Sequence, residues 1–231
     1  MPPVVLAVDV GGSHVKALAS NQRERRRFDS GTSLTPEEMV AGTLEAVADW
    51  SWDAVTVGIP SPVRGGKVVA EPVNLGDGWV GFDYEAAFGK PTKVVNDAVM
   101  QAVGSYEGGR MLFLGLGTGL GSAMIVDGVI EPLELGHLPF RKKTFEDYVG
   151  ERGLKKLGKK KWTKAVFAAV EQLAAAMEPD EVVLGGGGAE DLEELPEGCR
   201  RGVNENAFVG GFRLWDPDWV SNLRAPDGGS P

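Results

Sequence analysis

Asp9-Val-Gly-Gly-Ser-His-Val-Lys16 follows one apolar segment and leads into another. A second stretch of the same kind, Leu114-Gly-Leu-Gly-Thr-Gly-Leu-Gly121, also separates two apolar segments. Each pattern predicts two strands joined by a glycine turn. Glycine suits such a turn because it adopts backbone angles that other residues avoid and leaves the backbone bare for a ligand. The repeated unit predicts two similar lobes that face one another.

Predicted helices and strands alternate along the rest of the chain. Thr35-Pro36-Glu37-Glu38 predicts a helix start, with Thr35 as N-cap and Pro36 in the first turn. We expect this helix to stop near Trp50. Further helices are expected over about 97–106, 144–157, 161–177 and 205–214, and further strands over 54–58, 93–95 and 182–184.

The alternation indicates an α/β fold in two lobes. We expect an N-terminal lobe over residues 1–98 and a C-terminal lobe over residues 99–231. The last helix, 205–214, should pack back near the interface between the lobes. The small, polar residues 226–231 predict a disordered tail.

Composition excludes several classes of function. The 231 residues carry 24 Lys and Arg against 33 Asp and Glu, a net charge of -9, which disfavours a nucleic-acid-binding protein. No segment approaches the roughly 18–20 apolar residues of a membrane span. The N-terminus lacks the basic start of a signal peptide, so we expect a cytoplasmic protein. Cys199 alone forms neither an internal disulfide nor a cysteine-cluster zinc site.

The glycine turns differ from the common nucleotide-binding motifs. A dinucleotide-binding fingerprint needs a glycine loop that opens a helix, whereas strand-like residues follow both Gly12 and Gly121. The P-loop pattern G-x-x-x-x-G-K-S/T does not occur. Two interpretations remain: ordinary tight hairpins, or a pair of hairpins whose backbone amides bind phosphate oxygens.

Six motifs, in the same order along about residues 5–214, resemble those of the ROK-type sugar kinases in the actin/Hsp70/hexokinase superfamily. The resemblance implies a two-lobed ribonuclease H-like (actin-like ATPase) fold with a β-hairpin phosphate loop in each lobe. Phe145-Glu-Asp-Tyr-Val149 and Lys161-Trp162 resemble the zinc-less branch of glucokinases and polyphosphate glucokinases. The six motifs are Asp9–Lys16, Gly58–Val63, Asn96–Ala98, Leu114–Gly121, Glu134–His137 and Gly185–Gly188.

The resemblance implies phosphorylation of a hexose, with glucose at its 6-hydroxyl as the expected acceptor. Asp97 would be the catalytic base that takes the hydroxyl proton, although it also suits the N-cap of the helix that follows. His137 equally fits a surface histidine, and Glu146 equally fits an exposed acid at a helix start. The residues expected to bind the sugar are Asn96, Asp97, Glu134, His137, Glu146 and Asn74.

The same resemblance implies a donor site for ATP or polyphosphate with Mg²⁺. Asp9 would hold the Mg²⁺ ion through water. Lys16 fits either a phosphate contact or a solvated strand. We expect no zinc, because the cysteine cluster of the zinc-bearing relatives is absent. The residues expected to bind phosphate or nucleotide are Asp9, Gly11, Gly12, Ser13, Lys16, Gly117, Thr118, Gly119, Gly186, Gly187 and Gly188.

Three features depart from the family pattern or stand outside it. Ser61 replaces the glycine of the family's Gly-x-Pro-Gly-x-Val loop, and the region 140–200 is compressed. Residues 141–164 hold ten Lys and Arg but three acids, a local charge of +7. This basic run fits solvated helix faces or a track for polyphosphate.

Several other functions fit the motifs less well. They are a sugar-binding sensor without turnover, a kinase for mannose or N-acetylmannosamine, and an enzyme like acetate or glycerol kinase. An intact Asn96-Asp97 disfavours the sensor, and Glu134-Leu-Gly-His137 favours a hexose. The expected partners are therefore a hexose and a phosphate donor, without nucleic acid or membrane. The family also suggests a homodimer.

Overall fold

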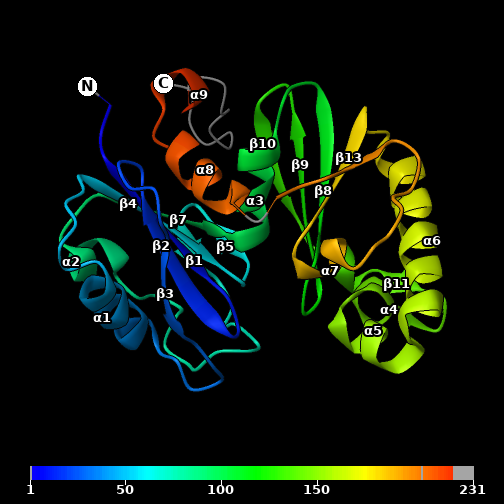
Figure 1. Cartoon of the computed structure of the whole chain (residues 1–231), viewed down its shortest axis with the longest axis horizontal. Coiled ribbons are helices and arrows are strands. Elements are labelled where there is room, and N and C mark those ends of the chain that lie inside the picture. The colour runs from blue at the N-terminus through cyan, green and yellow to red at the C-terminus, as the bar shows by residue number, and fades with distance from the viewer. Residues whose placement is uncertain (1, 204, 221–231) are drawn as a thin grey trace, which may run out of the picture. The chain divides into compact units, whose positions relative to one another are not determined.

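Each predicted glycine turn joins two antiparallel strands in the computed structural model, which describes residues 2–203 and 205–220. β1 (Val5–Val10) pairs with β2 (His14–Ala19), and β8 (Arg110–Leu116) pairs with β9 (Leu120–Val126) (Figure 1). The described residues divide into two units, one around each hairpin. The expected tail at 226–231 lies outside the described residues.

The first unit runs to Gly104 and takes back Ala207–Val220 from the end of the chain, whereas the second unit holds Ser105–Asn206. The predicted boundary at residue 98 falls inside helix α3 (Asp97–Ser105). The contacts of α3 place most of this helix in the first unit, so the chain divides after Gly104.

A five-stranded sheet forms the centre of the first unit, in the order β3-β2-β1-β4-β7. β1 runs antiparallel to β2 and parallel to β4, and β4 runs parallel to β7. A short hairpin, β5 (Val63–Arg64) and β6 (Lys67–Val68), follows β4. The other strands of the sheet are β3 (Arg26–Asp29), β4 (Ala54–Ile59) and β7 (Thr92–Asn96).

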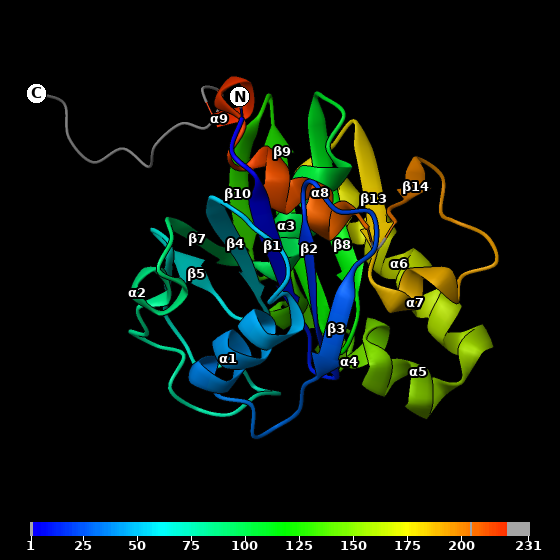
Figure 2. The same ribbon diagram turned by 60° about the vertical axis from the view of Figure 1, so that its left-hand side comes forward.

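Different helices cover the two faces of this sheet. Leu6 and Val8 of β1 belong to the same buried cluster as Met39 of α1 (Pro36–Ala46), which lies beside β2 and β3 (Figure 2). Ala7 faces the other way, toward Gly211 of α8 (Asn206–Arg213). Side chains alternate between the faces of a strand, so Asp9 shares the face of Ala7. The remaining helices of this unit are α2 (Tyr84–Phe88), α3 and α9 (Pro217–Val220).

The predicted start of α1 is confirmed, and its end lies earlier than expected. The Glu38 amide donates to Thr35 Oγ1 (3.3 Å) and the Thr35 amide donates to Glu38 Oε2 (3.0 Å), which is a capping box. The helix ends at Ala46 instead of near Trp50. The Arg26 guanidinium donates to the Ala46 carbonyl (2.7 Å), and a cation at this end stabilises the helix.

The sheet of the second unit has the order β10-β9-β8-β13-β14. No strand was predicted over β10. It contains Pro132 and lies at the sheet edge, where a proline is tolerated. The predicted helix over 144–157 is two helices that meet at Gly150. The remaining elements are β10 (Val129–Leu133), β11 (Pro139–Phe140), β12 (Lys143–Thr144), β13 (Glu181–Gly185), β14 (Cys199–Arg201), the 3₁₀ turn Leu135–His137, α4 (Phe145–Val149), α5 (Glu151–Leu157), α6 (Lys159–Met177) and α7 (Gly187–Glu190).

The long helix α6 covers one face of the second sheet (Figure 1). Its buried residues Trp162, Val166, Ala169 and Leu173 recur at helical spacing and join a core with Leu114 of β8. Of the helices in the described residues, none is both long and apolar enough to cross a membrane.

Two glycines let α8 pack closely against α3 and β1 of the first unit. A Cβ added at Gly210 would overlap the Met100 carbonyl oxygen, and one added at Gly211 would lie 2.7 Å from the Ala7 Cβ. The Thr56 hydroxyl donates to the Gly211 carbonyl (2.8 Å) and accepts a hydrogen bond from the Trp215 indole (2.9 Å). Helix α8 is therefore fixed to β1, β4 and α3.

We predict that Gly210→Ala lowers the free energy of unfolding by about 1–3 kcal/mol, because the added methyl group forces α8 away from Met100. Urea denaturation measures the change. Gly31→Ala is the matched control, since a Cβ at Gly31 meets nothing within 4 Å. Equal stability of the two variants would contradict this account of the packing.

Candidate functional site

The predicted residues of the first unit lie at the carboxyl ends of parallel strands. In the register of β1, β4 and β7, Asp9 lies opposite Gly58, and Ile59 lies opposite Asn96. Ligands of open α/β sheets bind at this edge. A Cβ added at Gly58 would lie 2.6 Å from the Met100 Cε, so the bare backbone at Gly58 lets α3 approach the sheet.

Asn96 links the end of β7 to the helix and loop beside it. Its Oδ1 accepts hydrogen bonds from the amides of Ala98 (2.9 Å) and Val99 (3.3 Å), and its Nδ2 donates to the Ser61 carbonyl (3.2 Å). Asn96 therefore caps the start of α3, one residue before Asp97, which the sequence offered as the N-cap. Asp97 is the first residue of α3, partly exposed, and its Oδ1 also accepts from the Ala98 amide (2.9 Å).

Asp9 forms an ion pair with Lys16 across the β1–β2 hairpin. The Lys16 Nζ lies 3.5 Å from Asp9 Oδ2, and the Asp9 side chain is 15% exposed. Burial raises the pKa of the Asp9 carboxyl above its usual value, and the nearby Lys16 ammonium opposes the rise. Lys16 is 33% exposed, so its side chain is neither buried nor fully solvated.

Asp9 fits the expected role toward Mg²⁺. Magnesium usually binds one or two carboxylates and completes its shell with water and substrate phosphates. A single, partly exposed carboxylate at a strand end suits that pattern. In the ranges 2–203 and 205–220, no three His, Cys, Asp or Glu side chains group closely enough to hold a metal ion by themselves.

The first glycine turn lies against a loop that brings Asn74 to it. The Gly11 amide donates to the His14 carbonyl (3.0 Å), which closes the turn around Gly12 and Ser13. A Cβ added at Gly12 would lie 3.6 Å from the Asn74 Cβ. The exposed Asn74 is therefore a neighbour of the turn, although 62 residues separate Asn74 from Gly12 in the sequence.

Ser61 is buried and makes a specific contact. Its Oγ donates to the Ala70 carbonyl (2.5 Å), and the residue is 3% exposed. Its carbonyl oxygen accepts the hydrogen bond from Asn96. The serine that replaces the family's glycine thus ties the end of β4 to the loop after β6.

The second glycine turn is packed against α4 and α5. The Gly117 amide donates to the Gly119 carbonyl (3.3 Å), and the Gly117 carbonyl accepts from the Glu151 amide (2.9 Å). A Cβ added at Gly119 would lie 2.7 Å from Glu146 Oε2, and one at Gly150 would lie 2.6 Å from the Thr118 carbonyl oxygen. The contact with backbone requires glycine at Gly150, whereas a side chain at Gly119 would displace the Glu146 carboxylate.

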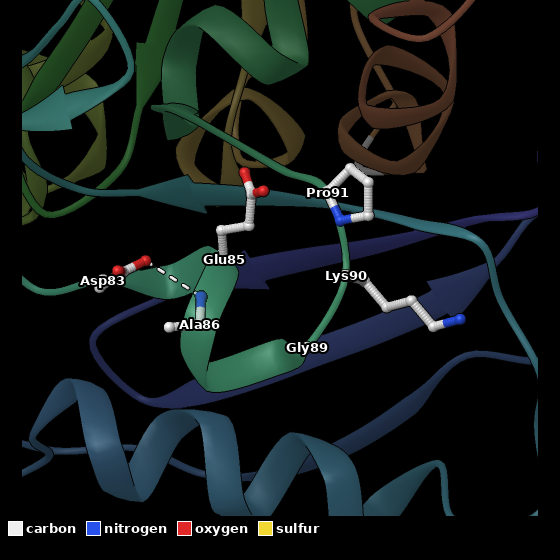
Figure 3. A pocket seen from close by; sticks show the side chains of 6 residues that line it. All are labelled: Asp83, Glu85, Ala86, Gly89, Lys90 and Pro91. Atoms are coloured by element: carbon white, nitrogen blue, oxygen red, sulfur yellow. Dashed lines mark hydrogen bonds between the residues drawn. The ribbon is translucent and has the colours of Figure 1, made fainter.

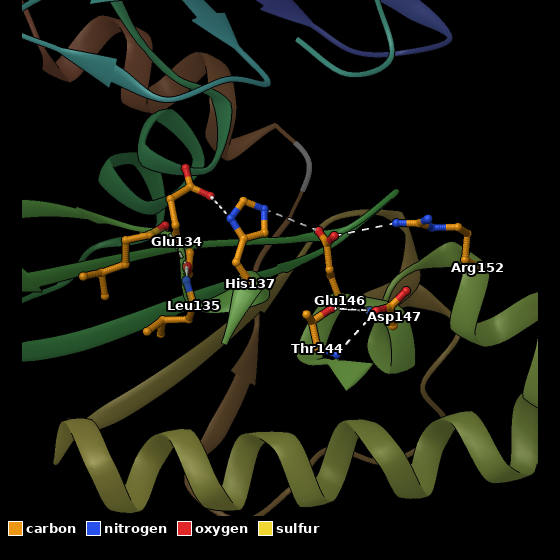
Figure 4. A network of polar contacts seen from close by, with 9 residues as sticks. Glu134, Leu135, His137, Thr144, Glu146, Asp147 and Arg152 are labelled. Carbon is orange, nitrogen blue, oxygen red and sulfur yellow. Dashed lines mark hydrogen bonds and ion pairs between the residues drawn. The ribbon is translucent and has the colours of Figure 1, made fainter. Parts of the chain in front are cut away.

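Three expected sugar-binding residues of the second unit meet in one cluster (Figure 4). The 3₁₀ turn after Glu134 places His137 Nδ1 4.0 Å from Glu134 Oε2, while His137 Nε2 lies 4.0 Å from Glu146 Oε2. The guanidinium of Arg152 lies 3.6 Å from Glu146 Oε1. The imidazole thus lies between two carboxylates.

The cluster is accessible to a ligand from solvent. The side chains of Glu134, His137 and Glu146 are 51%, 65% and 26% exposed. Partial burial raises the pKa of Glu134 above its usual value, His137 opposes the rise, and Glu146 adds to it. Two carboxylates and an imidazole offer the mixture of hydrogen-bond acceptors and donors that a polyhydroxylated ring requires.

A cavity of about 380 Å³ adjoins the second glycine turn. Gly186 has φ 76°, and a Cβ there would lie 2.6 Å from the Leu116 carbonyl oxygen, so only glycine fits between β13 and β8. The sequence predicted four of the lining residues as site residues and missed the rest, of which Glu151, Leu154, Lys155 and Asp191 lie outside every motif. The lining residues are Leu116, Gly117, Thr118, Val149, Glu151, Leu154, Lys155, Gly187, Gly188 and Asp191.

A larger hollow, of about 630 Å³, lies beside the short helix α2 (Figure 3). None of its lining residues was expected in the site, and the Asp83 carboxylate is occupied in accepting the Ala86 amide (3.0 Å). We assign this hollow no role. Its lining residues are Asp83, Glu85, Ala86, Gly89, Lys90 and Pro91.

Ion pairs divide the basic run 141–164 into two groups. Four cations have acidic partners: Lys143 with Asp147 (3.9 Å), Arg152 with Glu146 (3.6 Å), Lys155 with Glu151 (2.6 Å) and Lys159 with Glu193 (2.9 Å). Arg141 lies over the ring of Phe140 (4.9 Å). Within the described part of the chain, five exposed lysines have no acidic partner: Lys142, Lys156, Lys160, Lys161 and Lys164.

No protein-family model matches the sequence. The chain is 28% identical over 204 residues to the polyphosphate glucokinase of Mycobacterium leprae, an alignment that covers 78% of this chain and 62% of that enzyme. The chain therefore spans less than two thirds of that relative's length.

Solved structures show the same fold. The inorganic polyphosphate/ATP-glucomannokinase of Arthrobacter sp. strain KM has a TM-score of 0.81 and 24% identity, over 93% of this chain and 98% of that one. The ROK-family glucokinase of Streptomyces griseus has a TM-score of 0.73 and 17% identity, over 91% and 98%. The chain therefore shares the fold of these sugar kinases. The predicted two-lobed actin-like ATPase fold is confirmed.

Proposed function

We propose that this chain phosphorylates glucose at its 6-hydroxyl and takes the phosphoryl group from ATP or inorganic polyphosphate. The meeting of Glu134, His137 and Glu146 in contacts of 4.0 Å carries the proposal, because Glu146 comes from a different helix and the three side chains share the chemistry of a sugar site. The names of the relatives support it. The Mycobacterium leprae relative is a polyphosphate glucokinase, and the Streptomyces griseus structure contains glucose and AMPPNP.

Asp97 would act on the acceptor. As the sugar oxygen forms its bond to the terminal phosphorus, the Asp97 carboxylate takes the hydroxyl proton. The bond from that phosphorus to the bridging oxygen breaks, which leaves ADP or a polyphosphate shortened by one phosphate. Phosphoryl transfer depends mainly on alignment and charge stabilisation, so one positioned carboxylate suffices as base.

The glycine turns would act on the donor. Backbone amides at Gly11–Ser13 and Gly117–Gly119 can donate to phosphate oxygens without interference from side chains. Lys16 would add a positive charge once a phosphate competes with Asp9 for its ammonium group. Asp9 would hold Mg²⁺, which when bound supplies positive charge to the phosphates. Gly186, Gly187 and Gly188 would line the nucleotide end.

A coupled assay for sugar 6-phosphate tests the proposal, with glucose, mannose, N-acetylmannosamine and fructose each paired with ATP and with polyphosphate. We expect product from glucose with at least one donor. Absence of product with every pair, together with measurable glucose binding, would replace the kinase with a sugar-binding sensor. Product from another hexose in preference to glucose would correct the acceptor.

We predict that Asp97→Asn lowers kcat by about 10²–10⁴-fold, since the amide cannot accept the proton. The Kd for glucose should change little, because the amide keeps the size and an acceptor oxygen. Steady-state kinetics and calorimetric titration measure the two effects. Glu45→Gln, an exposed change on α1, is the control for charge removal. Substantial residual turnover in Asp97→Asn would remove Asp97 from the role of base.

We further propose that the unpaired lysines at the start of α6 and the end of α5 contact polyphosphate. Lys156, Lys160, Lys161 and Lys164 are exposed, and the described residues provide no acid to neutralise them. Lys159 stands in the same run, but its ion pair with Glu193 makes it a poorer contact. A chain of phosphates needs several such charges, whereas ATP needs few.

We predict that the triple variant Lys156→Gln, Lys160→Gln, Lys164→Gln raises the KM for polyphosphate about tenfold or more and the KM for ATP less than twofold. The estimate takes roughly 0.5–1 kcal/mol for each exposed charge contact. The triple variant Arg64→Gln, Lys67→Gln, Lys90→Gln removes the same charge from exposed positions elsewhere and is the control. Equal changes for both donors would assign the lysines to a solvated helix surface.

A further inference from the structure

The loop that carries Asn74 to the first glycine turn has neither helix nor strand. It comprises residues 71–80, between β6 and α2. Its backbone amides therefore need partners other than those of a helix or a sheet. Within the loop, the Leu75 amide donates to the Pro72 carbonyl over 3.4 Å, which is long for such a bond. The shape of the loop must come from side chains and from neighbouring segments.

One carboxylate closes this loop. The Trp79 amide donates to Glu71 Oε2 (3.0 Å), and the Val80 amide donates to Glu71 Oε1 (3.2 Å). Both oxygens of the side chain are engaged, so the first residue of the loop is joined to the last two. Hydrogen bonds from backbone amides to a carboxylate are stronger than those between neutral groups.

The other side of the loop is held against the segment before α1. The Gly76 amide donates to the Leu34 carbonyl (2.9 Å), and a Cβ added at Gly76 would lie 2.7 Å from the Ser33 carbonyl oxygen. Leu75 and Trp79 are buried in the apolar core of the first unit. The loop is therefore anchored on both sides of its exposed residues.

The exposed part of the loop lies beside the first glycine turn. Val73 is 94% exposed, and Asn74 beside it is also exposed. The Asn74 Cβ lies 3.6 Å from the position that a Cβ at Gly12 would take. An amide side chain donates and accepts hydrogen bonds, which suits a sugar hydroxyl that approaches a phosphate held at this turn.

We propose that Glu71 is a positioning residue for the acceptor sugar and acts through Asn74. Its carboxylate fixes the loop 71–80, so that Asn74 is held beside the glycine turn before the sugar arrives. Glu71 lies outside the six motifs, and its own oxygens are already engaged with the loop. The inference rests on the proposed function and adds to it a residue that acts without touching the sugar.

Loss of the carboxylate would reach Asn74 for a physical reason. Trp79 is fully buried, so its amide would have no partner without Glu71, and an unpaired buried amide is costly. The loop must then open to bring this amide to water. Part of the free energy of sugar binding would be used to order the loop again, and the affinity for sugar would fall.

A double-mutant cycle tests the proposal, with calorimetric titration of glucose into the full chain. We expect Asn74→Ala to raise the Kd for glucose about tenfold and Glu71→Ala about three- to tenfold. The double variant should bind glucose within twofold of Asn74→Ala, because Glu71 has no further effect once Asn74 is gone. Glu71→Gln keeps one acceptor oxygen and should lie between Glu71→Ala and the wild type.

Three results would overturn the proposal: additive effects of the two substitutions, an unchanged Kd in Glu71→Ala, or an unchanged Kd in Asn74→Ala. Asp77→Ala removes an exposed acid of the same loop and is the matched control, expected within twofold of the wild type. An equal loss of affinity in this control would also overturn the proposal. If thermal unfolding shows that Glu71→Ala is not folded, the cycle with Glu71→Gln decides by the same criterion.

The proposed function stands or fails by a separate measurement, sugar phosphorylation by the wild-type chain. Phosphorylation of glucose together with additive effects in the cycle would reject the role of Glu71 and keep the kinase. Coupled effects on glucose binding without phosphorylation would keep the role of Glu71 and reject the kinase. Absence of glucose binding by the wild-type chain would overturn both.

Discussion

Close approach of bare backbone at the second glycine turn is the constraint on which the site of the second unit depends. Gly119 leaves room for the Glu146 carboxylate, and Gly150 lets the junction of α4 and α5 touch the Thr118 carbonyl. Gly186 does the same for the loop after β13. A side chain at Gly150 or Gly186 would separate the turn from the groups that line the cavity, and one at Gly119 would displace the Glu146 carboxylate that approaches His137.

The first unit uses a different constraint, the register of parallel strands. Because β1, β4 and β7 run in the same direction, Asp9, Ser61 and Asn96 come to one edge of the sheet. The amides of Ala98 and Val99 then donate hydrogen bonds to Asn96 Oδ1, which ties the strand end to α3 and places Asp97 at the start of that helix. A rigid strand edge suits a catalytic base, whose position must be held closely.

Charge is distributed in the second unit in a way that suits two kinds of phosphate donor. Glu151 and Asp191 line the cavity, while unpaired lysines such as Lys160 lie on exposed helix positions. A nucleoside triphosphate and a polyphosphate would therefore share the glycine turn but use different neighbouring side chains. The unpaired lysines give this part of a chain of overall charge -9 a local excess of positive charge.

The sequence by itself determined the two glycine hairpins, the capping box of α1 and the order of the motifs, because turn and cap preferences act over a few residues. It did not determine β10, since Pro132 disfavours a strand except at an edge that only the folded sheet defines. Tertiary structure alone decided that Glu146 approaches His137, that Asn74 lies beside the first glycine turn, and that Asp191 lines a cavity. These contacts join distant segments, so local preference carries no signal for them.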